Sequence, residues 1–455
     1  MPSVAKKLLL YTKNIHFQSL LGNGSVAVFG VLIMGILYHG LTRDNAGMYA
    51  LFLTIFGFVD TFRTGFLTFP FVKFYTGTSP DREREITGST WMLAIVITTG
   101  FVILNLILQY LWPVHDDDLL FFIKYFPWLF IAGLPYFMAT IIVQGNKRFD
   151  RLLVLRLINQ LLYIIFIIML AFMKIMSIDK VLVFYIISNL VTSLFAMFAG
   201  WTSLDTIKNR SRTCMLEIYN FGKFSFGTNL SATMFKVTDV FFINFYLNKA
   251  ALAIYTLGGR LLQIIEIPLG SLTASGMAAL SDHFNKNEKK EMMHLMKKMT
   301  GMVSFGLMIL AVLSIIFAYP IIYIIGGEQY IHTEAPNLFR LFMSIAILYP
   351  ADRFFAVALD VIHKPQINFY KILIMLASNI AGDFIGLQIY RSIYSVVLVG
   401  LIPTIIAIVV AYIPLKKYSP FSLLGIYTSG YRSSVELLRD GWRSAAGRQE
   451  ETKQH

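Results

Sequence analysis

Apolar stretches of about twenty residues recur from one end of this chain to the other and restrict it to very few folds. The stretch LLYIIFIIMLAFM at 161–173 is one example, and it lacks the alternation of a membrane β-strand. Only 14% of the 455 residues are charged, against about 25% in a soluble domain, and 56% are hydrophobic. A bilayer is therefore the natural solvent, and an all-α integral membrane fold is predicted.

Twelve segments are long and apolar enough to form membrane-spanning helices, each of which needs about 20 residues. They are 20–40, 46–72, 88–111, 118–142, 152–173, 180–202, 224–247, 250–280, 299–325, 335–360, 368–390 and 393–415. Six lie on either side of a basic connector, which predicts two six-helix bundles. The predicted domains are an N-terminal bundle at 1–205, a cytoplasmic connector at 206–223, a C-terminal bundle at 224–416 and a cytoplasmic tail at 417–455.

Lysine and arginine residues gather in the loops at alternate ends of these segments, and Lys364 and Lys371 are counted as loop cations of this kind. The opposite ends hold only Arg43, Lys174, Lys180, Lys249 and Arg391. Because cytoplasmic loops carry the excess of basic residues, both termini are predicted in the cytoplasm. These loops also explain the net charge of +13, which in a soluble protein would suggest a nucleic-acid partner. We expect no nucleic acid as a partner of this chain.

Reactive and metal-ligating patterns are scarce in the sequence. The single cysteine, Cys214, can form no internal disulfide, the histidines are scattered, and there is no phosphate-binding glycine loop. No catalytic residue, metal site or cofactor is predicted. The predicted outer loops are short, which argues against an enzyme such as a membrane polysaccharide polymerase or ligase.

Charged residues nevertheless occur inside the apolar segments. The stretch FKVTDVFFINFYL at 235–247, for example, holds both Lys236 and Asp239. A charge facing lipid at the bilayer centre costs roughly 2.5–3.5 kcal/mol or more. The cations that lie more than four residues from either end of a predicted segment are Arg63, Lys124, Lys236, Arg260, Arg340 and Arg353. Lys124 and Arg340 are near outer ends and can reach water, so the other four are expected to face inward and line a hydrated cavity between the bundles.

Two of these cations have an acid three residues away on the same helical face, in the pairs Asp60–Arg63 and Lys236–Asp239. Two interpretations stay open for each pair. The charges either neutralise each other and hold helices together, or they line the cavity. Further acids of the apolar segments are Glu266, Asp352 and Asp383. Arg260 has no obvious local partner, and the adjacent Asp352 and Arg353 point about 100° apart on a helix.

Two stretches carry a family resemblance. The first is LTRDNAGMYALFLTIFGFVDTFRTGF at 41–66, where Gly47-x-Tyr49 opens the second segment. The second is 221–284, which combines an aspartate in the seventh segment, a short outer loop, Ala-x-Tyr, an internal proline and a basic loop. These features resemble the polysaccharide-transporter branch of the multidrug/oligosaccharidyl-lipid/polysaccharide (MOP) exporter superfamily, to which O-antigen flippases belong.

The resemblance implies a MATE-like fold of two six-helix bundles that alternate access around a central cavity. It implies an undecaprenyl-diphosphate-linked oligosaccharide as cargo, moved from the inner to the outer leaflet of the cell inner membrane for surface polysaccharides such as the O-antigen of lipopolysaccharide. Partners would be this lipid, membrane lipids, and protons or sodium. The residues expected to bind the diphosphate are Arg63, Lys236, Arg260 and Arg353, and those expected to couple ions are Asp60, Asp239 and Glu266.

Other transport functions fit parts of the same pattern. A proton- or sodium-coupled multidrug exporter of the superfamily would use the acids to bind cationic drugs. Lipid II flippases have fourteen spans and an arginine cluster in the first, whereas this sequence predicts twelve spans and no arginine in the first, so lipid II is a poor candidate cargo. A scaffold protein fits the hydropathy but not the inward-facing charges.

Overall fold

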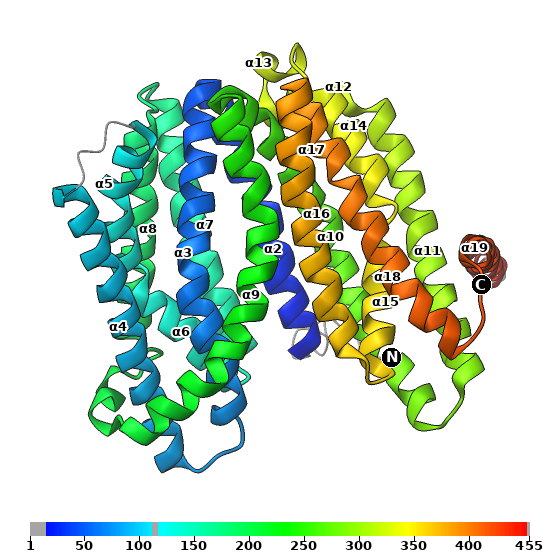
Figure 1. Cartoon of the computed structure of the whole chain (residues 1–455), viewed down its shortest axis with the longest axis horizontal. Coiled ribbons are helices and arrows are strands. Elements are labelled where there is room, and N and C mark those ends of the chain that lie inside the picture. Colours follow the sequence, from blue (N-terminus) through cyan, green and yellow to red (C-terminus); the bar gives the residue numbers. More distant parts are fainter. Residues whose placement is uncertain (1–14, 112–116, 453–455) are drawn as a thin grey trace. The chain divides into compact units, whose positions relative to one another are not determined.

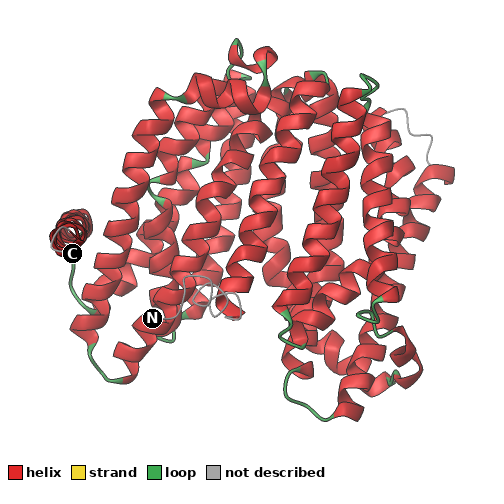
Figure 2. Ribbon diagram, turned by 180° about the vertical axis from the view of Figure 1, so that it is seen from behind, coloured by secondary structure: helices red, strands yellow, loops and turns green. Residues whose placement is uncertain are grey.

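The computed structural model describes residues 15–111 and 117–452, and these residues form helices and no strand (Figure 2). Nine helices of the described part are long and apolar enough to cross a membrane, or ten if one bent pair counts as a single span. The predicted all-α membrane fold is confirmed. The first and seventh predicted segments coincide with α2 (Ile15–Gly40) and α9 (Arg212–Tyr246), which do not pass that test, so the count of twelve stays a prediction.

The chain divides into two compact units, which we describe separately. Unit 1 consists of Met1–Leu257 and Ile324–Tyr330, and unit 2 consists of Gly258–Tyr323 and Ile331–His455. The division falls inside α10 (Lys249–Asn285), because α9 packs against the helices that precede it. The sequence-based bundles at 1–205 and 224–416 are a different division of the chain and stay a prediction.

Unit 1 contains most of the N-terminal helices. Besides α2, α9 and the start of α10, they are α3 (Arg43–Tyr75), α4 (Pro80–Leu111), α5 (Asp117–Ala132), α6 (Leu134–Gly145), α7 (Phe149–Phe172), α8 (Ile178–Phe198), the 3-10 helix η1 (Leu204–Asn209) and α13 (Glu328–Ile331). Hydroxyl oxygens of Thr42, Ser177 and Ser211 accept backbone N–H groups in the first turns of α3, α8 and α9. Such caps satisfy donors that a helix start leaves free.

The predicted connector at 206–223 is largely helical. Because Ser211 caps α9, this helix already begins at Arg212, and Cys214 and Ile218 are buried against α3, α4 and α6. The preceding η1 lies against α4, where the indole nitrogen of Trp91 donates a hydrogen bond of 2.8 Å to the carbonyl of Thr202. The connector is therefore part of the core of unit 1.

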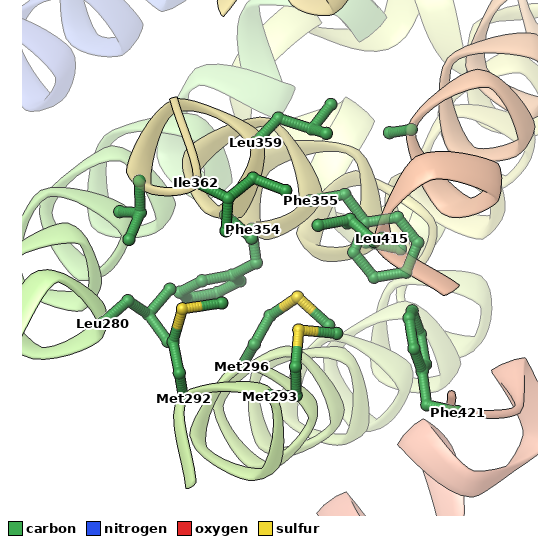
Figure 3. Packing of buried hydrophobic residues seen from close by; sticks show 14 of the residues in the cluster. Leu280, Met292, Met293, Met296, Phe354, Phe355, Leu359, Ile362, Leu415 and Phe421 are labelled. Atoms are coloured by element: carbon green, nitrogen blue, oxygen red, sulfur yellow. The ribbon is translucent and has the colours of Figure 1, made fainter. Parts of the chain in front are cut away.

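Unit 2 contains the rest of α10 and the C-terminal helices. They are α11 (Lys289–Ile316), most of α12 (Ala318–Gly326), α14 (Ala335–Ala346), α15 (Tyr349–Val361), α16 (Pro365–Tyr390), α17 (Ile393–Val399), α18 (Leu401–Tyr418) and α19 (Leu423–Thr452). In its core, Met292, Met293 and Met296 of α11 pack against Phe354 and other residues of α15 and α18 (Figure 3). This methionine face is buried, and only three residues separate α10 from α11.

The predicted tail at 417–455 continues as a helix in the described residues. Figure 1 shows α19 end-on beside α11, whose axis lies in the plane of the view, so the two helices cross steeply. They meet at two glycines. A Cβ added to Gly301 would lie 2.2 Å from the carbonyl oxygen of Ile426 and 2.7 Å from the Cα of Gly430. Only residues without a side chain allow this approach.

Replacing Gly301 by alanine is expected to detach α19 from α11, because the new methyl group meets helix backbone that cannot move aside. We expect trypsin to cleave after Arg432 at least about threefold faster, since an overpacked contact loses about 1–3 kcal/mol. Limited proteolysis of the purified protein measures the rate. Gly306→Ala is the matched control, because a Cβ at Gly306 meets nothing within 4 Å. Equal cleavage of both variants would contradict the glycine contact.

Candidate functional site

The helices α3 and α9 of unit 1 pack side by side in opposite directions. The hydroxyl groups of Thr61 and Thr233 share a hydrogen bond of 3.2 Å. Glycines bring the two backbones close, because a Cβ at Gly65 would lie 3.2 Å from the Cα of Phe226, and a Cβ at Gly222 would lie 2.5 Å from the carbonyl oxygen of Phe66. These contacts fix the register of the pair.

This register brings four of the predicted charged residues to one region of unit 1. With Thr61 opposite Thr233, the backbone of Lys236 lies about two residues, or about 3 Å, from the level of Asp60. Arg63 and Asp239 fall on either side, so all four positions lie within about 12 Å along the helix pair. We call Asp60, Arg63, Lys236 and Asp239 the charged band. Sequence alone could not place the two pairs beside each other.

Arg63 is buried within the band, with 4% of its side chain exposed. Its Nε and Nη2 atoms lie 3.0 and 2.7 Å from Oδ1 of Asp60, whose side chain is 24% exposed. The two side chains therefore form an ion pair, and the two interpretations of its role stay open. The guanidinium also lies 4.5 Å from the ring centre of Phe130 and 4.6 Å from that of Phe137. Aromatic faces attract cations and compensate part of the lost hydration.

The third guanidinium nitrogen of Arg63 reaches a broken helix. Its Nη1 donates a hydrogen bond of 3.3 Å to the carbonyl of Phe130, near the end of α5. The helices α5 and α6 meet there at 44°, because Pro135 follows Gly133 and has no N–H group to donate. On α8, Ser193 spans the same break. Its hydroxyl donates to the carbonyl of Ala132 at 2.5 Å and accepts the N–H of Tyr136 at 3.1 Å.

Arg63 thus connects Asp60 of its own helix to the bend between α5 and α6. A buried cation that satisfies a freed carbonyl stabilises the bend. In the conformation described here, every guanidinium nitrogen of Arg63 faces a protein oxygen.

The other half of the band lies on α9. The hydroxyl of Tyr255, on α10, donates a hydrogen bond to Oδ2 of Asp239. This tyrosine belongs to the Ala-x-Tyr pattern singled out in the sequence, so the pattern supplies a partner for the intramembrane acid. Lys236 lies in α9, but its side chain is outside the described part of the structure. Its predicted pairing with Asp239 stays a prediction.

The remaining candidates belong to unit 2. Arg260 on α10 and Arg353 on α15 are exposed on this unit, and Glu266 on α10 is half-buried. Their grouping with the charged band, and the roles assigned to all seven candidates, stay predictions. Lys124 of α5 pairs with Asp179 at 2.9 Å, and Arg340 of α14 donates to the carbonyl of Ile315 at 3.1 Å.

Unit 2 holds an intramembrane ion pair that the sequence analysis missed. Lys371 of α16, which was counted among the loop cations, is 4% exposed, and its Nζ lies 2.6 Å from Oδ1 of Asp352. The loop assignment of Lys371 is wrong, because α16 begins six residues earlier, at Pro365. About three turns further along α16, Asp383 is fully buried and accepts a hydrogen bond of 3.1 Å from Asn379. Asn379 and Asp383 are four residues apart, and this spacing was visible in the sequence as a signal of their contact.

No cluster of three or more histidine, cysteine, aspartate or glutamate side chains that could hold a metal ion occurs among the described residues. What the charged band offers chemically is a set of ionisable groups inside an apolar protein. Such groups bind ions or polar cargo, or change their pairing when an acid is protonated.

Solved structures of membrane transporters share this fold. An inward-facing multidrug resistance MATE family transporter of the MOP superfamily matches with a TM-score of 0.72 and 13% identity, over 89% of this chain and 96% of that one. The lipid II flippase MurJ, in an inward closed conformation, gives 0.70 and 16%, over 91% of each chain. A MOP superfamily transporter from Pyrococcus furiosus gives 0.60 and 14%, over 89% and 95%. The fold is therefore that of the MOP transporters.

The family is shown by sequence. Residues 40–335 match the family described as polysaccharide biosynthesis protein, and the chain belongs to that family. No curated protein sequence matches the chain. The protein is thus a multi-pass membrane protein, similar to the polysaccharide transporters of the MOP superfamily.

Proposed function

We propose that this protein moves an undecaprenyl-diphosphate-linked oligosaccharide from the inner to the outer leaflet of the cell inner membrane. The cargo would serve the synthesis of a surface polysaccharide such as an O-antigen, and both termini would lie in the cytoplasm. The observation that carries the proposal is the charged band at one level of two packed helices, in a chain of the polysaccharide biosynthesis family. No chemical reaction is part of the proposal.

The physical task is to carry a diphosphate and several sugars through hydrocarbon while the polyprenyl tail stays in lipid. Cations in a polar cavity can replace the water that the diphosphate loses, because charge-assisted hydrogen bonds to phosphate are strong. We assign this role to Lys236, Arg260 and Arg353 in all conformations. The exposure of Arg260 and Arg353 on unit 2 supports the assignment, since their side chains are accessible to a ligand.

Arg63 takes part in a different way under this proposal. Protonation of Asp60 would weaken its two contacts with the guanidinium and release Arg63 toward the diphosphate. Because the same guanidinium holds the carbonyl of Phe130, its release would also loosen the bend between α5 and α6. Proton or sodium binding at Asp60, and similarly at Asp239 and Glu266, would thereby be coupled to a change of conformation.

Replacing Lys236 and Arg260 together by glutamine tests the cargo. Surface glycan display is expected to fall below about a tenth of the wild-type level, because each lost phosphate contact removes about 1.5–3 kcal/mol. Glycan staining of whole cells measures display, and membrane fractionation shows that the variant inserts. Arg340→Gln is the control, since this arginine hydrogen-bonds locally to Ile315. Unchanged display in the double variant would refute the diphosphate-binding role.

A second candidate is a proton- or sodium-coupled multidrug exporter, favoured by the close fold match with a multidrug MATE transporter and by the acid Asp239 beside Tyr255. Its aromatic and anionic contacts would suit a cationic drug. Assays on cells that express the variants decide between the two functions. Resistance to cationic dyes that is lost in Asp239→Asn, with normal glycan display, would identify the exporter instead of the flippase.

A further inference from the structure

Unit 1 contains an open groove where α2 and α7 end. It has a volume of about 810 Å³ and is mainly apolar, with Lys174 and His39 as its ionisable residues. Its lining comes from α2, from the end of α7 and the loop that follows, and from the last turn of α12: Val31, Leu32, Gly35, Ile36, Gly40, Ala171, Met176, Ile324 and Ile325. The helix α7 is long and apolar enough to span the membrane, so the groove lies at the end of a candidate membrane span.

A second hollow of about 360 Å³, which is more polar than the groove and which we call the polar hollow, adjoins it. The two share His39 and Gly40, and the polar hollow is further lined by Thr42, Glu328, Gln329 and neighbouring residues of 41–42 and 326–327. A mainly apolar space therefore lies next to a more polar one. A ligand that fills both must carry an apolar part and a polar head on the same molecule.

The walls where the two hollows meet are fixed by hydrogen bonds. Nδ1 of His39 lies 2.8 Å from the carbonyl oxygen of Gly35, which holds the ring. Nε2 of Gln329 donates to the carbonyls of Tyr38 and Leu41, and the ring of Tyr330 lies 5.1 Å from that of Tyr38. These contacts tie the short helix α13 to the end of α2. The double hollow is thus built before a ligand arrives, which reduces the entropy lost on binding.

The position of the charges indicates the head group. Lys174 lines the apolar groove and is a suitable donor to a phosphate. Glu328 lines the polar hollow, where it attracts an ammonium group and repels a second phosphate or carboxylate. We propose that the double hollow binds a glycerophospholipid with a phosphoethanolamine head. Its acyl chains would fill the apolar groove, its phosphate would lie near Lys174 and its ammonium near Glu328.

The apolar groove favours acyl chains over water as its contents, because apolar walls give water no hydrogen-bond partners. Glu328 in the polar hollow would repel the diphosphate of the cargo proposed above. The lipid proposed here is therefore a different molecule from the cargo. The bound phospholipid is accordingly a resident lipid at the ends of α2 and α7. This inference does not depend on the proposed transport function.

The test measures lipid retention by the full chain. The protein is exchanged into nanodiscs with equal amounts of phosphatidylethanolamine, phosphatidylglycerol and phosphatidylcholine, and lipids that remain after brief detergent extraction are identified by native mass spectrometry. Phosphatidylethanolamine is expected to be retained about twofold to fivefold over phosphatidylglycerol, as a partly exposed charge pair provides. Glu328→Gln should remove this preference, and Lys174→Gln should lower retention of all three lipids.

The groove itself is tested by filling it. Ala171 is exposed and lines the groove, so Ala171→Trp adds bulk there without entering the core, and we expect it to abolish retention. Lys180→Gln and Glu334→Gln are charge-matched controls outside both hollows and should retain lipid like the wild type. Retention unaffected by Ala171→Trp would overturn the site. An unchanged lipid preference in Glu328→Gln, or equal retention of phosphatidylglycerol and phosphatidylethanolamine by the wild type, would overturn the proposed head group.

Discussion

Replacing Arg63 by methionine is expected to lower the stability of the protein by about 3–5 kcal/mol. The change removes one partner of a buried ion pair, which leaves Asp60 without compensation in an apolar surrounding and the carbonyl of Phe130 without its donor. Methionine keeps most of the apolar volume, so the loss reports on charge and hydrogen bonding. The apparent melting temperature of the purified protein in detergent measures the effect, and an unchanged value would contradict the contacts described for Arg63.

The double variant Asp60→Asn/Arg63→Met distinguishes a structural role of this ion pair from a role in transport. Removing both charges should recover most of the lost stability, apart from about 1 kcal/mol for the missing bond to Phe130. If glycan display recovers together with stability, the pair only holds helices together. If stability recovers and display does not, the charge of Arg63 is needed for the cargo or its coupling. This comparison decides between the two interpretations that the sequence leaves open for the pair.

Replacing Gly47 by alanine is expected to destabilise unit 1 by about 1–3 kcal/mol or more. The added Cβ would lie 1.9 Å from the carbonyl oxygen and 2.6 Å from the carbonyl carbon of Lys249 at the start of α10. Backbone cannot rotate away as a side chain can, so α3 and α10 would have to separate. The melting temperature should fall, and less of the variant should insert into membranes in a folded form.

A control on the same helix makes this result specific. A Cβ at Gly57 meets nothing within 4 Å, so Gly57→Ala should leave stability unchanged or raise it by up to about 1 kcal/mol, as alanine favours a helix over glycine. The two substitutions are chemically identical, and we expect effects of opposite sign. Equal effects would show that the close approach of α3 and α10 does not control the stability of unit 1.

The sequence motifs could be recognised from the sequence, but the contacts that explain them could not. Gly47-x-Tyr49 stood out at the start of the second segment, but only the structure shows that Gly47 faces the backbone of Lys249 and that the hydroxyl of Tyr49 hydrogen-bonds that of Tyr163. In the same way, the contact between Arg63 and Phe130 joins residues 67 positions apart at a helix bend. Its two partners could not be matched from local spacing.

Lys371 shows how the predictions failed. A lysine near the start of an apolar segment resembles a loop cation, since the positive-inside pattern places such residues in cytoplasmic loops. The helix begins earlier than the apolar run, because Pro365 starts α16 and the first turns need not be hydrophobic. Lys371 then points to Asp352 on the neighbouring α15 instead of to water. Charge and hydropathy locate a segment in the membrane but do not give the partner of a buried charge.

Composition and periodicity by themselves determined that this chain is an all-α membrane protein and that Asp60 and Arg63 share a helical face. Those properties depend on the transfer of single helices from water to lipid, which is a sum over nearby residues. Tertiary structure alone decided which helices touch, that Arg63 also holds the bend of α5 and α6, and that the apolar and polar hollows join at His39. These depend on packing between residues distant in the chain, where a single glycine or proline changes which surfaces meet.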